Sequence, residues 1–567
     1  MLTAILGTLA RCSPIDADPD ADLRRSLGFL DAEVSPETVA TAGYGAAGVV
    51  AALAVPVIVL VPGRWFRTTL LAAVAAALVA AHALRRGPVV LARARRTAAL
   101  GDAPGLVARA VLRMQIEPAV ETAAGFAART GRGPLAESLD GHVRRADGTP
   151  RSGLAGFADE WDAWFPAITR ATHLIAAAAA APSGERSRTL DRALTAALDG
   201  TRDRMAAFAS DVHAPATGLY AFGVLLPLAL VAVVPAAGVA GAPVTLPLFV
   251  FAYDAVLPLG LVSGSAWLLL RRPVAFPPPA VSRSHPDVPD RRWPPVAIGG
   301  AAGALAAAGS ALLLPVWTAW VAGVGVGVGA TLVRWYRPIV EVRERVRSVE
   351  EGLVDALYLV GRRVAEGEAV ESAVERAAEE VGGATGEVLT AASRRGRQLG
   401  VGVRESFLGE YGALADVPSP RTRSTAALLA IAAVEGRPAG RAVVAMADHV
   451  EELQTVEREA QRELARVTGT LRSTASAFGP LVAGTTVALA GGIGGADLGG
   501  SALPVPGLGL AVGAYVLLLA VVLAALSAGL EHGLDRAVVG YRAGRALCSA
   551  TLVYLVAFAA GGALVNV

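Results

Sequence analysis

Nine apolar runs constrain this chain more than any other feature, because each is about as long as a membrane is thick. A helix needs about 20 mostly apolar residues to cross a hydrocarbon layer of about 30 Å. The runs lie at Ala42–Val61, Phe66–Leu84, Leu219–Ala240, Leu246–Leu270, Val296–Leu314, Val316–Val333, Ala475–Gly492, Leu508–Leu530 and Ala546–Val565. Together with a mean hydropathy of +0.50 over 567 residues, they predict an all-α, polytopic membrane protein with about nine transmembrane helices.

The arginines predict how these helices are oriented, because short loops rich in Lys or Arg stay in the cytoplasm. The arginines lie at the ends of the apolar runs in every second connection between runs, at Arg85, Arg86, Arg271, Arg272, Arg291, Arg292, Arg334, Arg337, Arg472, Arg536, Arg542 and Arg545. The other short loops contain no arginine, except that Arg64 and Arg67 lie on the opposite side. We therefore expect a cell-membrane protein with a cytoplasmic N-terminus, an extracytoplasmic C-terminus and both long polar regions in the cytoplasm.

The two polar regions, Gly101–Ser210 and Ile339–Thr474, have the three-and-four spacing of apolar residues that is typical of helices. The clearest pattern, from Val443 to Val467, predicts one long amphipathic helix that leads straight into the seventh apolar run. We expect each region to be a bundle of five or six short helices.

Short repeats indicate that the two regions are duplicated domains. Ala119-Val120-Glu121-Thr122-Ala123 recurs as Ala369-Val370-Glu371-Ser372-Ala373, and Ala221-Phe222-Gly223 recurs as Ala477-Phe478-Gly479. The expected organisation is a cytoplasmic head with an acidic patch (1–40), a transmembrane pair (41–84), helical domain 1 (85–216), a second pair (217–271), a Pro-rich linker (272–295), a third pair (296–335), helical domain 2 (336–474) and three transmembrane helices (475–567).

Several function classes are excluded by composition. The chain has no lysine, so it lacks the residue with which a Walker A loop reaches the nucleotide phosphates. Its 51 basic and 49 acidic residues nearly balance, which does not favour a nucleic-acid partner. Cys12 and Cys548 are far apart and no Cys/His ligand spacing occurs, so we expect no disulfide and no metal. No catalytic or cofactor-binding residue stands out.

Three single residues invite a stronger interpretation. Asp254 lies inside the fourth apolar run, where an acid is costly and often functional, but no partner lies in the runs and we favour a packing role. His82 and His532 have no spaced companions, so we expect interfacial positions for both.

Two segments of the second region carry a resemblance to a known family. The sequence Arg363-Val364-Ala365-Glu366-Gly367-Glu368-Ala369-Val370-Glu371-Ser372-Ala373 resembles the helix–Gly–helix opening of inner-membrane platform proteins from type II secretion systems, type IV pili, Tad pili and archaella. Ala433-Val434-Glu435-Gly436, followed by Gly440, resembles the family's second acidic-Gly turn. In the first region, Met114-Gln115-Ile116-Glu117-Pro118 lacks the opening glycine. The number of apolar runs resembles the archaeal pilus and archaellum branch.

The resemblance implies a non-enzymatic platform without cofactors. It would bind a cytoplasmic secretion ATPase through its helical bundles and pass the motor's movement to pilin-like subunits. The implied partner-binding residues are Glu366, Gly367, Glu371, Glu435, Gly436, Glu117 and Glu121. These glycines could equally serve only to permit turns, and the glutamates to cap helices. Membrane lipid is a further expected partner, and the small residues in the apolar runs predict a homo-oligomer.

Three other functions compete with this interpretation. A transporter can be built from two parallel repeats, but the apolar runs offer few polar groups for a substrate. The membrane half of an ABC exporter has cytoplasmic extensions that continue its spans, rather than separate bundles. A membrane sensor would need a catalytic or phosphoacceptor block, which the sequence lacks.

Overall fold

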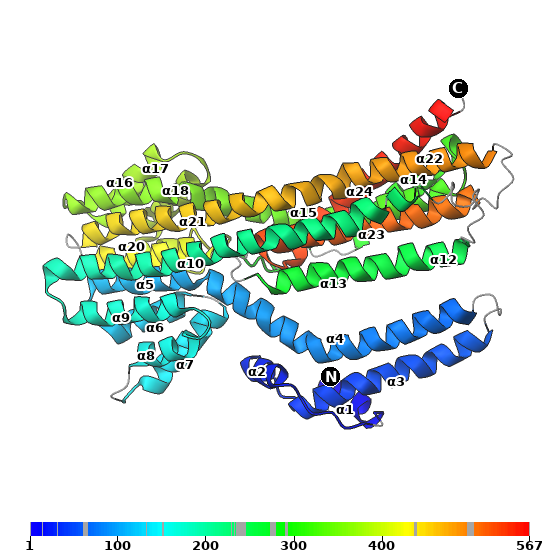
Figure 1. Ribbon diagram of the computed structural model, residues 1–567. Helices are drawn as coiled ribbons and strands as arrows, with labels where there is room; N and C mark the ends of the chain where they lie inside the picture. Colours follow the sequence, from blue (N-terminus) through cyan, green and yellow to red (C-terminus); the bar gives the residue numbers. More distant parts are fainter. Residues whose placement is uncertain are drawn as a thin grey trace.

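The structure is a computed structural model. It describes all residues except 1, 14, 31, 61–65, 132, 150–151, 228, 232, 234–244, 273–278, 290–292, 436–438, 496–503 and 566–567. The described residues form α-helices and three short π-helical segments, with no strand among them (Figure 1). The predicted all-α fold is therefore confirmed.

The first half begins with a small head and a helical hairpin, followed by a bundle. The head and hairpin are α1 (Leu2–Arg11), α2 (Ala21–Phe29), α3 (Pro36–Leu60) and α4 (Phe66–Gly101). The bundle helices are α5 (Ala103–Ile116), α6 (Val120–Thr130), α7 (Pro134–Ala146), α8 (Gly153–Trp161), α9 (Pro166–Ala180) and α10 (Ser183–Tyr220). The half continues through the π-helix η2 (Ala221–Leu225) and ends with α12 (Leu246–Val250), η3 (Phe251–Val256) and α13 (Leu257–Leu270).

After its head, the first half has a pair of long helices and a bundle of six, and the second half repeats this order. It opens with α14 (Trp293–Leu313) and α15 (Thr318–Glu351). The bundle helices are α16 (Leu353–Ala365), α17 (Val370–Glu380), α18 (Gly383–Leu399), α19 (Val403–Leu408), α20 (Pro420–Glu435) and α21 (Ala439–Ser473). The π-helix η4 (Thr474–Phe478) follows, and then α22 (Gly479–Gly495), α23 (Val505–His532) and α24 (Arg536–Val565).

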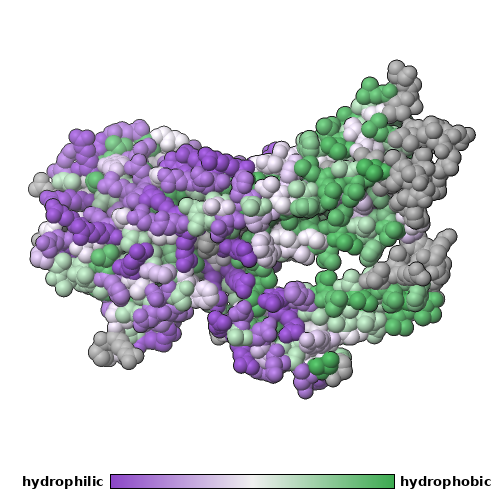
Figure 2. All heavy atoms as spheres, in the orientation of Figure 1, coloured by the Kyte–Doolittle hydropathy of each residue, from purple (hydrophilic) through white to green (hydrophobic). Residues whose placement is uncertain are grey.

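Polar and apolar surfaces occupy opposite ends of the molecule (Figure 2). The short helices of both bundles lie at the polar end, and the apolar helices lie side by side at the other (Figure 1). Many large apolar side chains are exposed on the apolar helices, among them Leu312 and Leu313, each 85% exposed. A lipid environment would cover such a surface, which identifies a helical membrane protein.

Eight helices among the described residues are long and apolar enough to cross a membrane, one fewer than the nine predicted. They are Pro36–Val59, Ala72–Ile116, Gly184–Val231, Leu246–Leu270, Trp293–Leu313, Gly440–Gly491, Val505–His532 and Arg536–Leu564. The missing one is the run Val316–Val333, which forms the first part of α15. Its glycines, such as Gly323, Gly325 and Gly327, give it less apolar surface than a typical span.

That part of α15 nevertheless packs closely against α14. A Cβ atom on Gly303 of α14 would lie 2.7 Å from the Gly323 carbonyl oxygen, and one on Gly299 would lie 2.7 Å from that of Gly327. These pairs show that the two helices are antiparallel. Small residues allow such close approach of helix backbones.

Two long helices connect the polar end to the apolar end. α10 continues through η2, and α21 continues through η4 into α22, so the predicted continuous helix is confirmed. A π-helical turn inserts an extra residue into an α-helix and frequently marks a functional position. The repeated Ala-Phe-Gly motif lies in η2 in the first half and at the η4–α22 boundary in the second.

The two bundles pack on each other rather than standing apart. Leu112 of α5 and Phe126 of α6 are buried in the apolar core of the second bundle, together with residues such as Leu357 and Met446. The head also has a small core, in which Leu23 and Leu27 of α2 contact Val39 and Val89 of the α3–α4 hairpin.

Candidate functional site

The first part of the candidate site is the turn between α16 and α17, which contains Glu366 and Gly367. Gly367 has a φ of +103°, a backbone conformation that side chains other than hydrogen strongly disfavour. Its N–H donates to the Val364 carbonyl at 3.0 Å, and the Glu366 N–H donates to the Arg362 carbonyl at 3.0 Å. The glycine is therefore required by the turn, whatever the turn contacts.

Two acidic side chains at this turn are exposed. The Glu366 carboxylate lies 3.3 Å from the Arg362 guanidinium in an exposed pair one helical turn apart. Glu371 is exposed in the first turn of α17, where a negative charge is favoured by the helix dipole. Both glutamates can contact a partner. Glu371 also suits the start of its helix, whereas Glu366 lies at the C-terminal end of α16, where the helix dipole disfavours a negative charge.

The fold brings this turn next to the start of α21. A Cβ atom on Gly440 would lie 2.4 Å from the backbone nitrogen of Ala365, so the two backbones are in contact. Glu435, whose side chain falls outside the described part of the structure, ends α20 just before this point. Gly436 also lies outside the described residues. Figure 1 places this end of α16 and α21 farthest from the apolar helices.

The corresponding glutamates of the first bundle are engaged in internal contacts. Glu117 ends α5 and forms an ion pair with Arg113. Glu121, in the first turn of α6, accepts a hydrogen bond of 2.7 Å from the Ser152 hydroxyl, at the start of α8. The first bundle therefore uses Glu121 to fix the relative position of two of its own helices.

A second part of the site is an ion-pair network between helices of the second bundle. The Arg421 guanidinium of α20 lies 3.1 Å from the carboxylates of both Glu350 on α15 and Glu457 on α21. Burial lowers the pKa of Arg421, but these two carboxylates outweigh it and raise the pKa above its ordinary value. The network joins α15 and α21 through α20, and no pattern in the sequence predicted it.

A third part is the junction where four helices meet at the boundary of the apolar end. Glu531, at the end of α23, has a side chain that is only 8% exposed. It accepts hydrogen bonds from Thr468 at 2.6 Å, Arg472 at 2.6 Å and Arg542 at 2.5 Å, which lie on α21 and α24. Arg272, just after α13, donates to the backbone carbonyls of Gly529 at 2.7 Å and Glu531 at 3.0 Å.

We call the contacts of Glu531 and Arg272 the junction network. In the sequence, Arg272, Arg472 and Arg542 indicated only the orientation of the spans, and their common contact with Glu531 was not predicted. The available signal was Glu531 itself, an acid at the end of an otherwise apolar run. Burial lowers the pKa of Arg272 to about 9, and the nearby Glu531 counteracts part of that effect.

A fourth contact fixes α15 to the loop before α24. The Arg343 guanidinium makes two parallel hydrogen bonds to the Asp535 carboxylate, at 2.7 and 2.8 Å. The same carboxylate accepts from the Ala537 and Val538 N–H groups at 2.9 and 3.0 Å, and so caps the first turn of α24. Burial alone would raise the pKa of Asp535. The hydrogen bonds from Arg343 and Val538 have the larger effect and hold the pKa below its ordinary value.

The remaining singled-out residues are also placed. Asp254 lies in η3, and its Oδ1 is buried without a hydrogen-bond partner, so its packing role stays a prediction. His532 lies 3.7 Å from Glu531, while His82 lines a cavity beside the head. Within the described residues, no group of three or more His, Cys, Asp or Glu side chains is arranged to hold a metal ion.

Comparisons with known proteins give no relative: no protein-family model, curated protein or solved structure matches this chain. The function must therefore be inferred from the arrangement of the helices and their contacts.

Proposed function

We propose that the chain is a non-enzymatic membrane platform of a type IV pilus-like or type II secretion-like assembly machine. In this role it binds a cytoplasmic secretion ATPase and passes the motor's movement to pilin-like subunits. The observation that carries the proposal is the pair of long helices, α10 and α21, that run from the polar bundles into the apolar end. A structure that relays force needs such continuous rigid elements.

The two long helices are also fixed to each other. Arg202 of α10 lies 3.8 Å from Glu452 and 3.5 Å from Glu459, both on α21. His449 of α21 lies 3.7 Å from Asp191 of α10. Because closely packed helices move as bodies, a displacement at the ends of the bundles would shift both helices together.

The junction network continues this connection into the membrane. Glu531 links α21 to α23 and α24, and Arg272 adds α13 from the first half. Arg343 and Asp535 link α15 to the same region. Movement of either bundle would therefore reach the apolar helices of both halves.

The shared order of elements supports the view that the bundles are duplicated domains. We also propose that the first part of α15 crosses the membrane. The last part of α15, including Val342, Val346 and Val349, is buried towards the bundle, and α14 is antiparallel to the first part. A chain that crosses once along α14 must return along α15, which gives nine crossings, a cytoplasmic N-terminus and an extracytoplasmic C-terminus.

The exposed turn with Glu366 and Gly367 is the proposed contact with the motor, together with Glu371, Glu435 and Gly436. Oppositely charged side chains on an ATPase would give a matched and reversible contact. Because the turn lies beside the start of α21, a bound ATPase would exert its force on one end of that helix.

The test is co-purification of the full-length membrane protein with the secretion ATPase of its own organism. Reversing the charge of Glu366 and Glu435 together should lower the recovered ATPase by about tenfold or more, which is about 1.4 kcal/mol of binding free energy. The matched control is Glu463→Arg, an exposed charge reversal in the part of α21 nearer the membrane, which should leave recovery unchanged. Equal recovery in all three proteins would remove the turn from the contact, and no recovery even with the wild type would refute the platform.

A transporter is the second candidate, and one observation favours it. Asp254 has a buried carboxylate oxygen without a partner, in a π-helical segment within an apolar helix. Such a group can bind an ion or a proton. A transporter would lose flux into proteoliposomes on Asp254→Asn, whereas a platform would keep its ATPase contact.

A further inference from the structure

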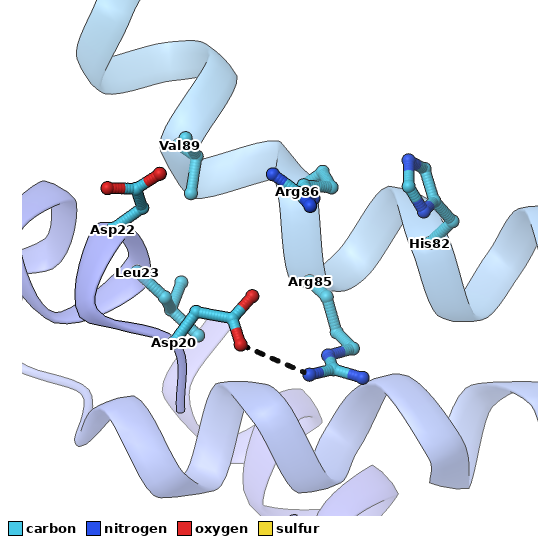
Figure 3. A pocket seen from close by; sticks show the side chains of 7 residues that line it. All are labelled: Asp20, Asp22, Leu23, His82, Arg85, Arg86 and Val89. Atoms are coloured by element: carbon cyan, nitrogen blue, oxygen red, sulfur yellow. Dashed lines mark ion pairs between the residues drawn. The ribbon is translucent and has the colours of Figure 1, made fainter. Parts of the chain in front are cut away.

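A cavity of about 150 Å³ lies between the N-terminal head and α4 (Figure 3). This volume is about ten times the 10–15 Å³ that one water molecule needs. Its lining residues are Asp20, Asp22 and Leu23 from the head and His82, Arg85, Arg86 and Val89 from α4. We call it the head cavity. Acidic groups line the head side of it, and basic groups line the α4 side.

Arg85 is held in place by its neighbours in the fold. Its guanidinium donates to the Tyr44 hydroxyl at 2.9 Å and lies 3.9 Å from the Asp20 carboxylate. Its stem packs on Gly43, where an added Cβ would lie 2.7 Å from the Arg85 Cγ. The arginine is therefore oriented before any ligand arrives, which lowers the entropy cost of binding.

The second arginine of the cavity has its charge available. Arg86 is exposed, as is its neighbour His82, and neither forms an ion pair or side-chain hydrogen bond with any described residue. The opposing acid Asp22 already interacts with Arg25 at 3.2 Å and Arg93 at 3.7 Å. A negatively charged group entering the cavity would thus meet cations that are not fully neutralised.

The position of the cavity on α4 indicates the rest of the ligand. Val74, Leu78 and His82 follow one another at intervals of four residues, and Arg86 continues this spacing, whereas Arg85 points from α4 toward the head (Figure 3). Val74 is 51% exposed and Leu78 is 65% exposed. An exposed apolar stripe along the membrane-spanning part of α4 therefore ends at the charged cavity.

The surroundings of this stripe leave room for lipid chains. The α3–α4 hairpin diverges from the other apolar helices, and Figure 2 shows an opening between apolar surfaces on either side. The hairpin meets the rest of the protein again farther along α4, where the Thr97 hydroxyl donates to the Arg272 carbonyl at 3.1 Å. The opening thus lies on the membrane side of this contact.

We propose that the head cavity binds the phosphate of an anionic phospholipid, whose acyl chains lie along the Val74–Leu78 stripe. Arg85 and Arg86 hold the phosphate, and His82 borders it on the membrane side. The lipid fills the space between α4 and the other apolar helices and fixes the head against α4. Basic pockets at the cytoplasmic ends of membrane helices are suited to anionic headgroups. A free phosphate ion shares the headgroup chemistry but would not use the stripe.

The test uses the full-length protein in detergent, with native mass spectrometry counting the lipids that remain bound. Phosphatidylglycerol and phosphatidylcholine are supplied in equal amounts, and inorganic phosphate is added in a separate arm. The wild type should retain phosphatidylglycerol in preference to phosphatidylcholine. Arg86→Gln should lower that retention by about fivefold, the effect of one arginine near a charged surface. The matched control is Arg95→Gln, an exposed arginine of the same helix outside the cavity, which should retain lipid as the wild type does.

A second variant tests the acyl-chain part of the proposal. Leu78→Asn leaves the cavity intact but interrupts the stripe. It should weaken retention of phosphatidylglycerol, whereas the amount of lipid that inorganic phosphate displaces should be the same as in the wild type. Equal losses in the Arg86 and Arg95 variants would overturn the proposal, because they would indicate only diffuse attraction to a basic surface. Displacement of the lipid by millimolar inorganic phosphate, together with no effect of Leu78→Asn, would also overturn it in favour of a soluble anion.

Discussion

Replacing Glu531 by alanine should loosen the junction at which α13, α21, α23 and α24 meet. The carboxylate accepts three hydrogen bonds of 2.5–2.6 Å, from Thr468, Arg472 and Arg542. Hydrogen bonds to charged groups contribute about 1.5–3 kcal/mol each. The Arg472 side chain is 55% exposed, so solvent screens its hydrogen bond and the bond contributes little to stability. The other two bonds predict a loss of about 3–6 kcal/mol, which overlaps the usual cost of about 3–5 kcal/mol for removing one partner of a buried ion pair.

Cys548 offers a direct measurement of this loss. It is half-buried on α24, and its sulfur lies 2.6 Å from where a Cβ of Gly329 on α15 would be. In a Cys12→Ser background, separation of α24 from α15 should expose Cys548 further and accelerate its labelling by a thiol reagent. A destabilisation of about 3 kcal/mol should accelerate labelling of the protein in detergent by up to about 150-fold.

The matched control is Glu463→Ala, which removes an exposed carboxylate of α21 that lies 3.7 Å from Arg466. Exposed pairs of this kind contribute less than about 1 kcal/mol, so labelling of Cys548 should change by about fivefold at most. Labelling in Glu531→Ala that stays within this same range would refute the reasoning, because the junction would then not hold α24 in place.

Two further predictions concern the bundle and its connection to α15. The pKa of Asp535 lies below its ordinary value of 3.8, so its pairing with Arg343 stabilises the fold fully above that value, and the contribution is lost as the pH falls through the lower folded pKa. Between about pH 6 and about pH 2, the midpoint temperature of unfolding should therefore fall more steeply in the wild type than in Asp535→Asn. Parallel plots of midpoint against pH for the two proteins would contradict this. Gly440→Val should lower stability by about 1–3 kcal/mol, because its side chain would overlap the backbone of Ala365 on α16. Gly469→Ala, on the same helix with open space around it, should raise stability by up to about 1 kcal/mol, and equal thermal midpoints for the two variants would argue against the close contact.

The apolar runs and the long amphipathic helix were predictable because their signals are local. A run such as Leu508–Leu530 carries its own apolar surface, and it forms α23 in the structure with bounds close to those predicted. The ninth predicted span, the glycine-rich run in α15, is not among the eight described helices that are apolar enough by composition to cross a membrane. Its short side chains reduce its apolarity, while its role depends on packing against α14, which no local pattern reports.

The candidate site was predictable only in part. The turn at Glu366 and Gly367 has a local cause, because the chain needs glycine to adopt a positive φ at that point. Its contact with the start of α21 follows from the way α16 and α21 pack, and the two segments lie far apart in the sequence. The internal use of Glu121 by Ser152 was likewise invisible in the sequence.

By itself, the sequence determined that this chain is helical, that its helices are apolar enough for a membrane, and where its main turns fall. These properties depend on hydrophobic periodicity and backbone preference over a few residues. Only the tertiary structure decided which charges meet, as when Arg272 donates to Glu531 across 259 residues of chain. Ion pairs and cavities are created by helices brought together in space, and the energy of a charge depends on the partners and burial it finds there.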